Sequence, residues 1–99
     1  SSGRSPLAPD VPSLAEAGIG NFNLEIWNAF AAPSTMPKPI QAKLAALISE
    51  IARSEEVRGK LFQQGWQTVG SSPEGLANRV KADTNLLGGV IAMRGIKAE

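Results

Sequence analysis

Trp27 and Asn28 are adjacent residues whose types suit recognition of a small molecule. An indole ring offers a flat amphipathic surface and a carboxamide both donates and accepts hydrogen bonds, so a polar cleft can use both to orient a ligand. The pair interrupts an in-out alternation between residues 22 and 32, because Asn28 falls in the apolar register and Trp27 in the polar one. Such a break indicates a bulge, a crossing between environments or a site. An ordinary boundary tryptophan beside a hydrogen-bonded strand asparagine explains the pattern equally well.

The residue types that are missing restrict the chemistry further. The chain has no histidine, cysteine or tyrosine, which excludes Ser-His-Asp and Cys-His pairs and imidazole or thiolate metal sites. Neighbouring carboxylates at Glu55 and Glu56 point about 100° apart on a helix and suit its positive end better than acid-base catalysis. Gly18 and Gly20 lack the third glycine of a dinucleotide loop. We therefore expect a protein that is not an enzyme and has no metal or cofactor.

Length and charge limit the class of protein. Ninety-nine residues allow one small domain or one part of something larger, and 42% of them are hydrophobic. Ten basic against nine acidic side chains give a net charge of +1, without a basic run, so nucleic acid is not an expected partner. No apolar stretch approaches the roughly 20 residues that cross a bilayer.

Local patterns predict a helix-rich α/β chain. Residues 1–12 hold three prolines and form an irregular lead-in. Ser13 and Glu16 form a capping box, and Gly18 is placed to end that short helix. The predicted helices cover 13–17, 37–53, 54–64 and 73–93, and the predicted strands cover 22–31 and 66–69. Gly88 and Gly89 cost the last helix about 1 kcal/mol each relative to alanine, which indicates a close neighbour or a kink there.

The order of these motifs resembles the C-terminal third of the solute receptors of tripartite tricarboxylate transporters, the TctC or Bug family. The resemblance covers roughly residues 4–99. The motifs that carry it are Arg4-Ser-Pro, Pro9-Asp-Val-Pro-Ser-Leu-Ala-Glu-Ala-Gly18, the apolar segment with Trp27 that ends at Phe30-Ala-Ala-Pro33, Pro37-Lys, Ser54-Glu-Glu-Val-Arg58, Leu61, Gly65, Val69-Gly70, Ser72-Pro-Glu74 and Gly95-Ile-Lys97. The family often has a small residue after the aromatic one, so Asn28 departs from its pattern.

The resemblance implies a fold, a function and a location. Residues 1–99 would be a single partial domain, a helix-rich partial lobe of a type II periplasmic-binding-protein (Venus-flytrap) fold, with residues 1–12 as an extended lead-in near the hinge. The whole receptor would capture small organic anions, commonly carboxylates, in the periplasm and pass them to the membrane permease subunits. We expect Trp27 and Asn28 to contact the ligand, by ring contact and hydrogen bonding respectively, and Asp10 to be a lesser candidate near the hinge.

The resemblance also implies that much of the ligand-binding backbone lies outside these 99 residues. We expect no measurable affinity of the isolated chain for citrate or aspartate, because one lobe cannot enclose a ligand. Uncovered apolar faces predict a homo-oligomer, through the edge of the 22–32 strand or by exchange of the last helix. The alternative function is a free-standing helical protein-protein interaction module without a ligand.

Overall fold

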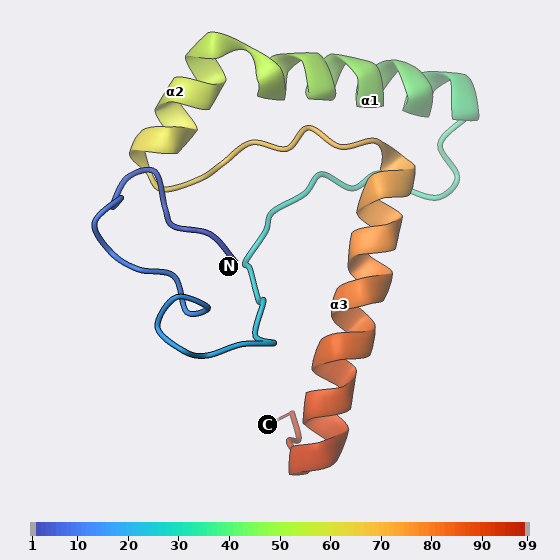
Figure 1. Ribbon diagram of the computed structural model, residues 1–99. Coiled ribbons are helices and arrows are strands. Elements are labelled where there is room, and N and C mark those ends of the chain that lie inside the picture. Colours follow the sequence, from blue (N-terminus) through green and yellow to red (C-terminus); the bar gives the residue numbers. More distant parts are fainter. Residues whose placement is uncertain (1, 99) are drawn as a thin grey trace.

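Three helices account for the regular structure of the chain. The computed structural model describes residues 2–98 and contains α1 (Lys38–Arg53), α2 (Glu55–Gln63) and α3 (Pro73–Arg94), as Figure 1 shows. The predictions of helices at 37–53, 54–64 and 73–93 are confirmed, with each end correct to within one residue. α1 and α2 follow each other around Ser54, and α3 runs down the side of the molecule opposite α2 (Figure 1).

Local capping explains why the second and third helices begin where they do. The Ser54 hydroxyl accepts a hydrogen bond from the Val57 amide at 3.5 Å, and the Ser72 hydroxyl accepts one from the Gly75 amide at 3.1 Å. Each bond satisfies an amide that has no partner inside the helix. α3 ends at Gly95, whose φ of 62° is a left-handed conformation that costs glycine little. These termini depend on neighbours in sequence alone.

The predicted capping box forms, but the predicted helix at 13–17 is wrong. The Ser13 amide donates to the Glu16 carboxylate at 2.8 Å, and the Glu16 amide donates to the Ser13 hydroxyl at 3.3 Å. Gly18, with φ of 97°, ends the segment immediately afterwards. Turns alone occupy the segment, because the stop signal follows too closely for a second helical turn.

Arg4 ties the lead-in to this turn. Its guanidinium donates to the Glu16 carboxylate at 2.7 Å and to the Pro9 carbonyl at 2.9 Å. The Arg4 contact first, and the Ser13 amide second, hold the pKa of Glu16 below its usual value. Residues 2–12 are mostly exposed and make two reverse turns, closed by hydrogen bonds from the amides of Ala8 and Val11. The lead-in therefore lies on the surface as a looped segment.

Both strand predictions are wrong for this chain: within residues 2–98 the structure contains no strand. Residues 22–32 run as irregular chain beside α3 (Figure 1), and Ile26 and Phe30 remain 85% and 77% exposed. Residues 66–69 are likewise irregular. A strand forms only when a second strand pairs with its backbone, and residues 2–98 contain no second strand. The α/β class, which concerns the complete lobe, stays a prediction.

The segment between α2 and α3 is nevertheless fixed to α1. The Gly70 carbonyl accepts hydrogen bonds from the Ser49 hydroxyl at 2.7 Å and from the Arg53 guanidinium at 2.9 Å. Gly70 has a φ of 59°, and Arg53 lies within 3.1 Å of the position that a Cβ would take there. A side chain at residue 70 would therefore be both strained and crowded.

The chain has very little interior. Of the described residues, Ser13 alone is buried, and the large apolar side chains are partly or well exposed. The accessible surface is 8474 Å², whereas a compact monomer of this mass exposes about 5,400 Å². The radius of gyration is 16.8 Å, against about 13 Å for a compact domain of this length. The helices thus frame an open molecule that leaves about 3,000 Å² uncovered relative to a globular domain.

Candidate functional site

Trp27 lies against the first half of α3, in a cluster of polar contacts. Its indole nitrogen donates to the Asp83 carboxylate at 2.6 Å. The same carboxylate oxygen accepts from the Arg79 guanidinium at 3.1 Å. Arg79 in turn lies 3.7 Å from the carboxylate of Glu25, on the same segment as Trp27. Two residues of the irregular segment are thereby attached to two residues one turn apart on α3, and we call these four residues the Trp27 cluster.

The electrostatics of the Trp27 cluster favour an ionised Asp83. The hydrogen bond from Trp27, followed by that from Arg79, holds the pKa of Asp83 below its ordinary value. The Asp83 side chain is 19% exposed and the Arg79 side chain 39%. A carboxylate already held by two donors is a poor general base, so this arrangement suits anchoring better than proton transfer.

An apolar groove on α3 adjoins the Trp27 cluster. It has a volume of about 330 Å³. Its lining consists of Trp27, Val80, Asp83, Thr84, Leu87, Gly88 and Ile91, and we call it the α3 groove. These α3 residues recur at helical spacing and therefore share one face of the helix. Because the indole nitrogen of Trp27 is engaged by Asp83, the ring surface is the part of this side chain that remains for a further contact.

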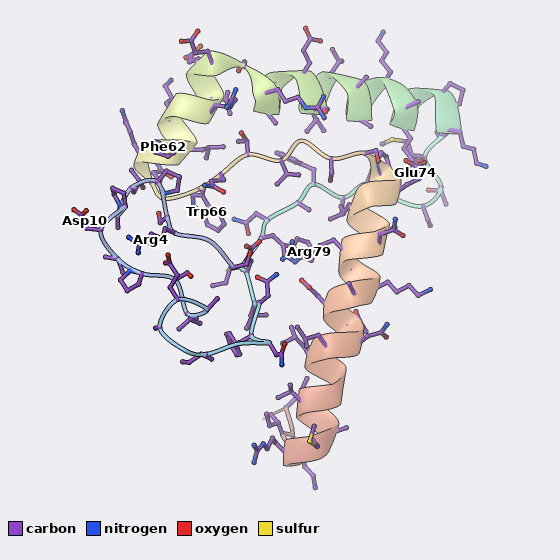
Figure 2. All side chains as sticks on the ribbon, viewed as in Figure 1. Arg4, Asp10, Phe62, Trp66, Glu74 and Arg79 are labelled. Carbon is purple, nitrogen blue, oxygen red and sulfur yellow. The ribbon has the colours of Figure 1, made fainter. Side chains whose placement is uncertain are left out.

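Asn28 and Asp10 lie outside the Trp27 cluster. Asn28 is exposed on the irregular segment next to Trp27. Asp10 is exposed on the lead-in loop, and Figure 2 shows it on the opposite side of the molecule from Arg79. The structure therefore brings Trp27 together with acidic and basic residues, and it does not bring Asp10 near them. Contacts of Trp27, Asn28 and Asp10 with a ligand stay predictions.

A second hollow lies between the lead-in and α2. It has a volume of about 600 Å³ and is wide open. Its lining consists of Pro6, Glu55, Arg58, Gly59, Phe62, Trp66, Gln67 and Thr68, and Figure 2 shows Phe62 and Trp66 beside the loop that carries Arg4. Acidic and basic side chains both border it, so its charge favours no particular class of ligand.

Sequence reasoning missed Asp83, Arg79 and Glu25. The sequence holds one indication of Asp83: this acidic residue falls among the apolar positions of the last helix, between Val80 and Leu87. An acidic residue at such a position needs a donor, and Arg79 is four residues before it. The indole that supplies the second donor is 56 residues away, a distance over which sequence pattern carries no signal.

The part of the chain that the structure describes holds no group of acidic residues arranged to bind a metal ion. Among those same residues, no helix has the length and apolar character needed to cross a membrane.

Comparison with known proteins finds two informative relatives. The chain is 35% identical over 82 residues to a UPF0065 protein in the tcbD-tcbE intergenic region of Pseudomonas sp. (strain P51), covering 82% of this chain and 24% of that protein. It is 30% identical over 95 residues to a UPF0065 protein in the TAR-I ttuE-ttuC' intergenic region of Agrobacterium vitis, covering 93% of this chain and 28% of that protein. UPF0065 proteins are of the Bug/TctC type. The chain thus spans about a quarter of the length of these curated relatives. No protein-family model matches the chain, and no solved structure does.

Proposed function

We propose that these 99 residues form the C-terminal part of a solute-binding receptor of the TctC/Bug type. Such a receptor works in the periplasm, without enzymatic activity, and captures small organic anions, above all carboxylates, for the permease subunits of a tripartite tricarboxylate transporter. The observation that carries the proposal is similarity to two UPF0065 proteins over 82% and 93% of this chain. The motif order from Arg4 to Lys97 supports it.

The open structure supports the proposal independently of sequence similarity. A surface about 3,000 Å² larger than that of a compact monomer is typical of a piece that packs against more protein. Many of the uncovered apolar residues lie on the segment 22–32 and on the helices, and in the proposed receptor the rest of the longer protein would cover them. Both hollows described above are open to solvent, as expected of a piece that needs further protein to enclose a ligand.

Trp27 has a defined place in this proposal. The Trp27 cluster holds the segment 22–32 against α3, with the indole ring at the edge of the α3 groove. In a receptor, a ring fixed at its polar end by Asp83 presents its surface to a ligand at low entropic cost. The exposed amide of Asn28 next to it supplies hydrogen-bonding capacity.

A hybrid protein tests the proposal. Residues 4–99 are joined to the part of the Pseudomonas sp. (strain P51) relative that precedes the matched region, and the hybrid is screened against mono-, di- and tricarboxylates by thermal shift and calorimetry. We expect the folded hybrid to bind at least one carboxylate, with weaker binding in its Trp27→Ala variant. The 99-residue chain alone is the control and is expected to bind none. A cooperatively folded hybrid that binds no carboxylate, while the unmodified relative binds one, would refute the proposal.

The alternative is a helical interaction module that acts without a ligand. It is favoured by one observation: α3 is exposed along nearly its whole length, with apolar residues on its surface. The length of the parent gene separates the two, because a receptor requires an open reading frame about three and a half times as long, by analogy with the two relatives. A transcript that encodes these residues alone would favour the interaction module.

A further inference from the structure

The second half of α3 is unusual for a helix in water. From Thr84 to Met93, ten consecutive residues carry no charge, and every one of them is exposed. Leu86, Leu87, Val90, Ile91 and Met93 are between 39% and 81% exposed. Large apolar side chains that stay exposed on a helix indicate a surface that another polypeptide covers.

Gly88 marks the place where a neighbour can approach most closely. It lines the α3 groove, and a methyl group added there or at Gly89 would meet no atom within 4 Å. α3 continues through both glycines as one helix (Figure 1). Because no atom of this chain packs against either position, contacts inside the chain do not offset the free energy that the two glycines cost the helix. Helix axes approach more closely where side chains at the contact are small. The gap left by the missing side chain of Gly88, which we call the notch, therefore fits a second helix.

Charge placement on α3 points to a second copy of the same helix. Gly88 lies near the middle of the uncharged stretch, with Asp83 five residues before it and Arg94 six residues after it. Asp83 and Arg94 lie about 8 Å from Gly88 along the helix axis, in opposite directions. If two α3 helices cross antiparallel at Gly88, the Asp83 of each copy therefore lies at the same height as the Arg94 of the other. A two-fold axis makes both pairs at once, as an isologous dimer requires.

We infer that the isolated chain forms an antiparallel homodimer in which the α3 grooves of two copies face each other, crossing at Gly88. Apolar residues around the notch of one copy fill the groove of the other. A stable interface takes about 800 Å² from each partner, so the contact must extend beyond the α3 groove along the exposed face of α3. The dimer uses no strand edge, and it does not depend on the receptor proposal, which concerns the longer protein.

Mass measurement with matched variants tests the dimer. Light scattering of the 99-residue chain at tens of micromolar should give about twice 10.4 kDa. Ile91→Lys, inside the α3 groove, should raise the dimer dissociation constant about tenfold or more, as loss of an interface anchor does. Val69→Lys is the control, because Val69 is 76% exposed and lies outside α3. Circular dichroism should show unchanged helix content in both variants.

Two further variants test the crossing point and the orientation. The chain has no cysteine, so Gly88→Cys should form an intermolecular disulfide on mild oxidation, since only residues at the crossing come within the roughly 7 Å that a disulfide allows; Val69→Cys should not. Arg94→Asp places an acidic residue next to Asp83 of the other copy and should weaken the antiparallel dimer by charge repulsion. Lys43→Asp, on α1, should leave the dimer unchanged. A helical monomer of 10.4 kDa would overturn the inference. A dimer unaffected by Ile91→Lys would also overturn it, because the contact would then lie on another surface.

Discussion

Replacing Gly89 with alanine tests whether the second half of α3 is an independent, exposed helix. A Cβ at this position would meet no atom within 4 Å, so the change adds no clash. Glycine costs a helix interior about 1 kcal/mol relative to alanine, because its unfolded backbone has more freedom. Alanine should therefore favour the helical form by about 1 kcal/mol, which corresponds to a factor of about five in the equilibrium between helix and open chain.

Hydrogen exchange is the assay that isolates this effect. We expect the amides of residues 90–94 to exchange about fivefold more slowly in Gly89→Ala than in the parent. Both proteins carry Ile91→Lys so that association does not protect the same amides. Gly20→Ala is the control, because Gly20 is equally unobstructed but lies outside the helices. Unchanged or faster exchange at residues 90–94 would refute the reasoning, since it would mean that α3 does not extend through Gly89 or that a neighbour occupies that position.

Two other predictions concern capping and pH. Ser72→Ala removes the hydroxyl that accepts from the first turn of α3 and should cost about 1 kcal/mol of helix stability, measured as a loss of ellipticity at 222 nm that Ser71→Ala does not reproduce. Lowering the pH should release Trp27 from Asp83. Since the pKa of Asp83 is lowered in the folded chain, its stabilising contribution is present above the unfolded pKa and is lost as the pH falls through the folded pKa. The fluorescence of Trp27, in a Trp66→Phe background, should therefore change with a midpoint below the ordinary aspartate value of 3.8. A midpoint at or above 3.8 would contradict the bond to Asp83.

Sequence predicted the helices well because their determinants are local. The Ser54 and Ser72 caps and the stop at Gly95 involve residues at most a few positions apart. The capping box at Ser13 was also predicted correctly, although the stop at Gly18 left no room for a helix. In each case the interaction energy belongs to one turn and does not require the rest of the fold.

The strands and the Trp27 cluster were not predictable in the same way. Alternation between residues 22 and 32 gave the period of a strand, but a strand forms only if another strand supplies hydrogen bonds. The break at Trp27 was found from the pattern, whereas its partner Asp83 is separated from it by 56 residues. Sequence therefore identified which residue was unusual and could not identify the contact that explains it.

The segment 22–32 is prepared for pairing even though it forms no strand. Trp27 and Glu25 attach it to α3 through Asp83 and Arg79, which restricts the chain before any partner arrives. The conformational entropy that pairing must overcome is smaller for a segment held in place than for a free one. Alternating apolar residues on an attached, exposed segment are what a neighbouring sheet edge can bury. The same residues should therefore become a strand when a longer polypeptide supplies that edge, and breaking the anchor with Trp27→Ala should weaken that pairing without altering α1 or α2.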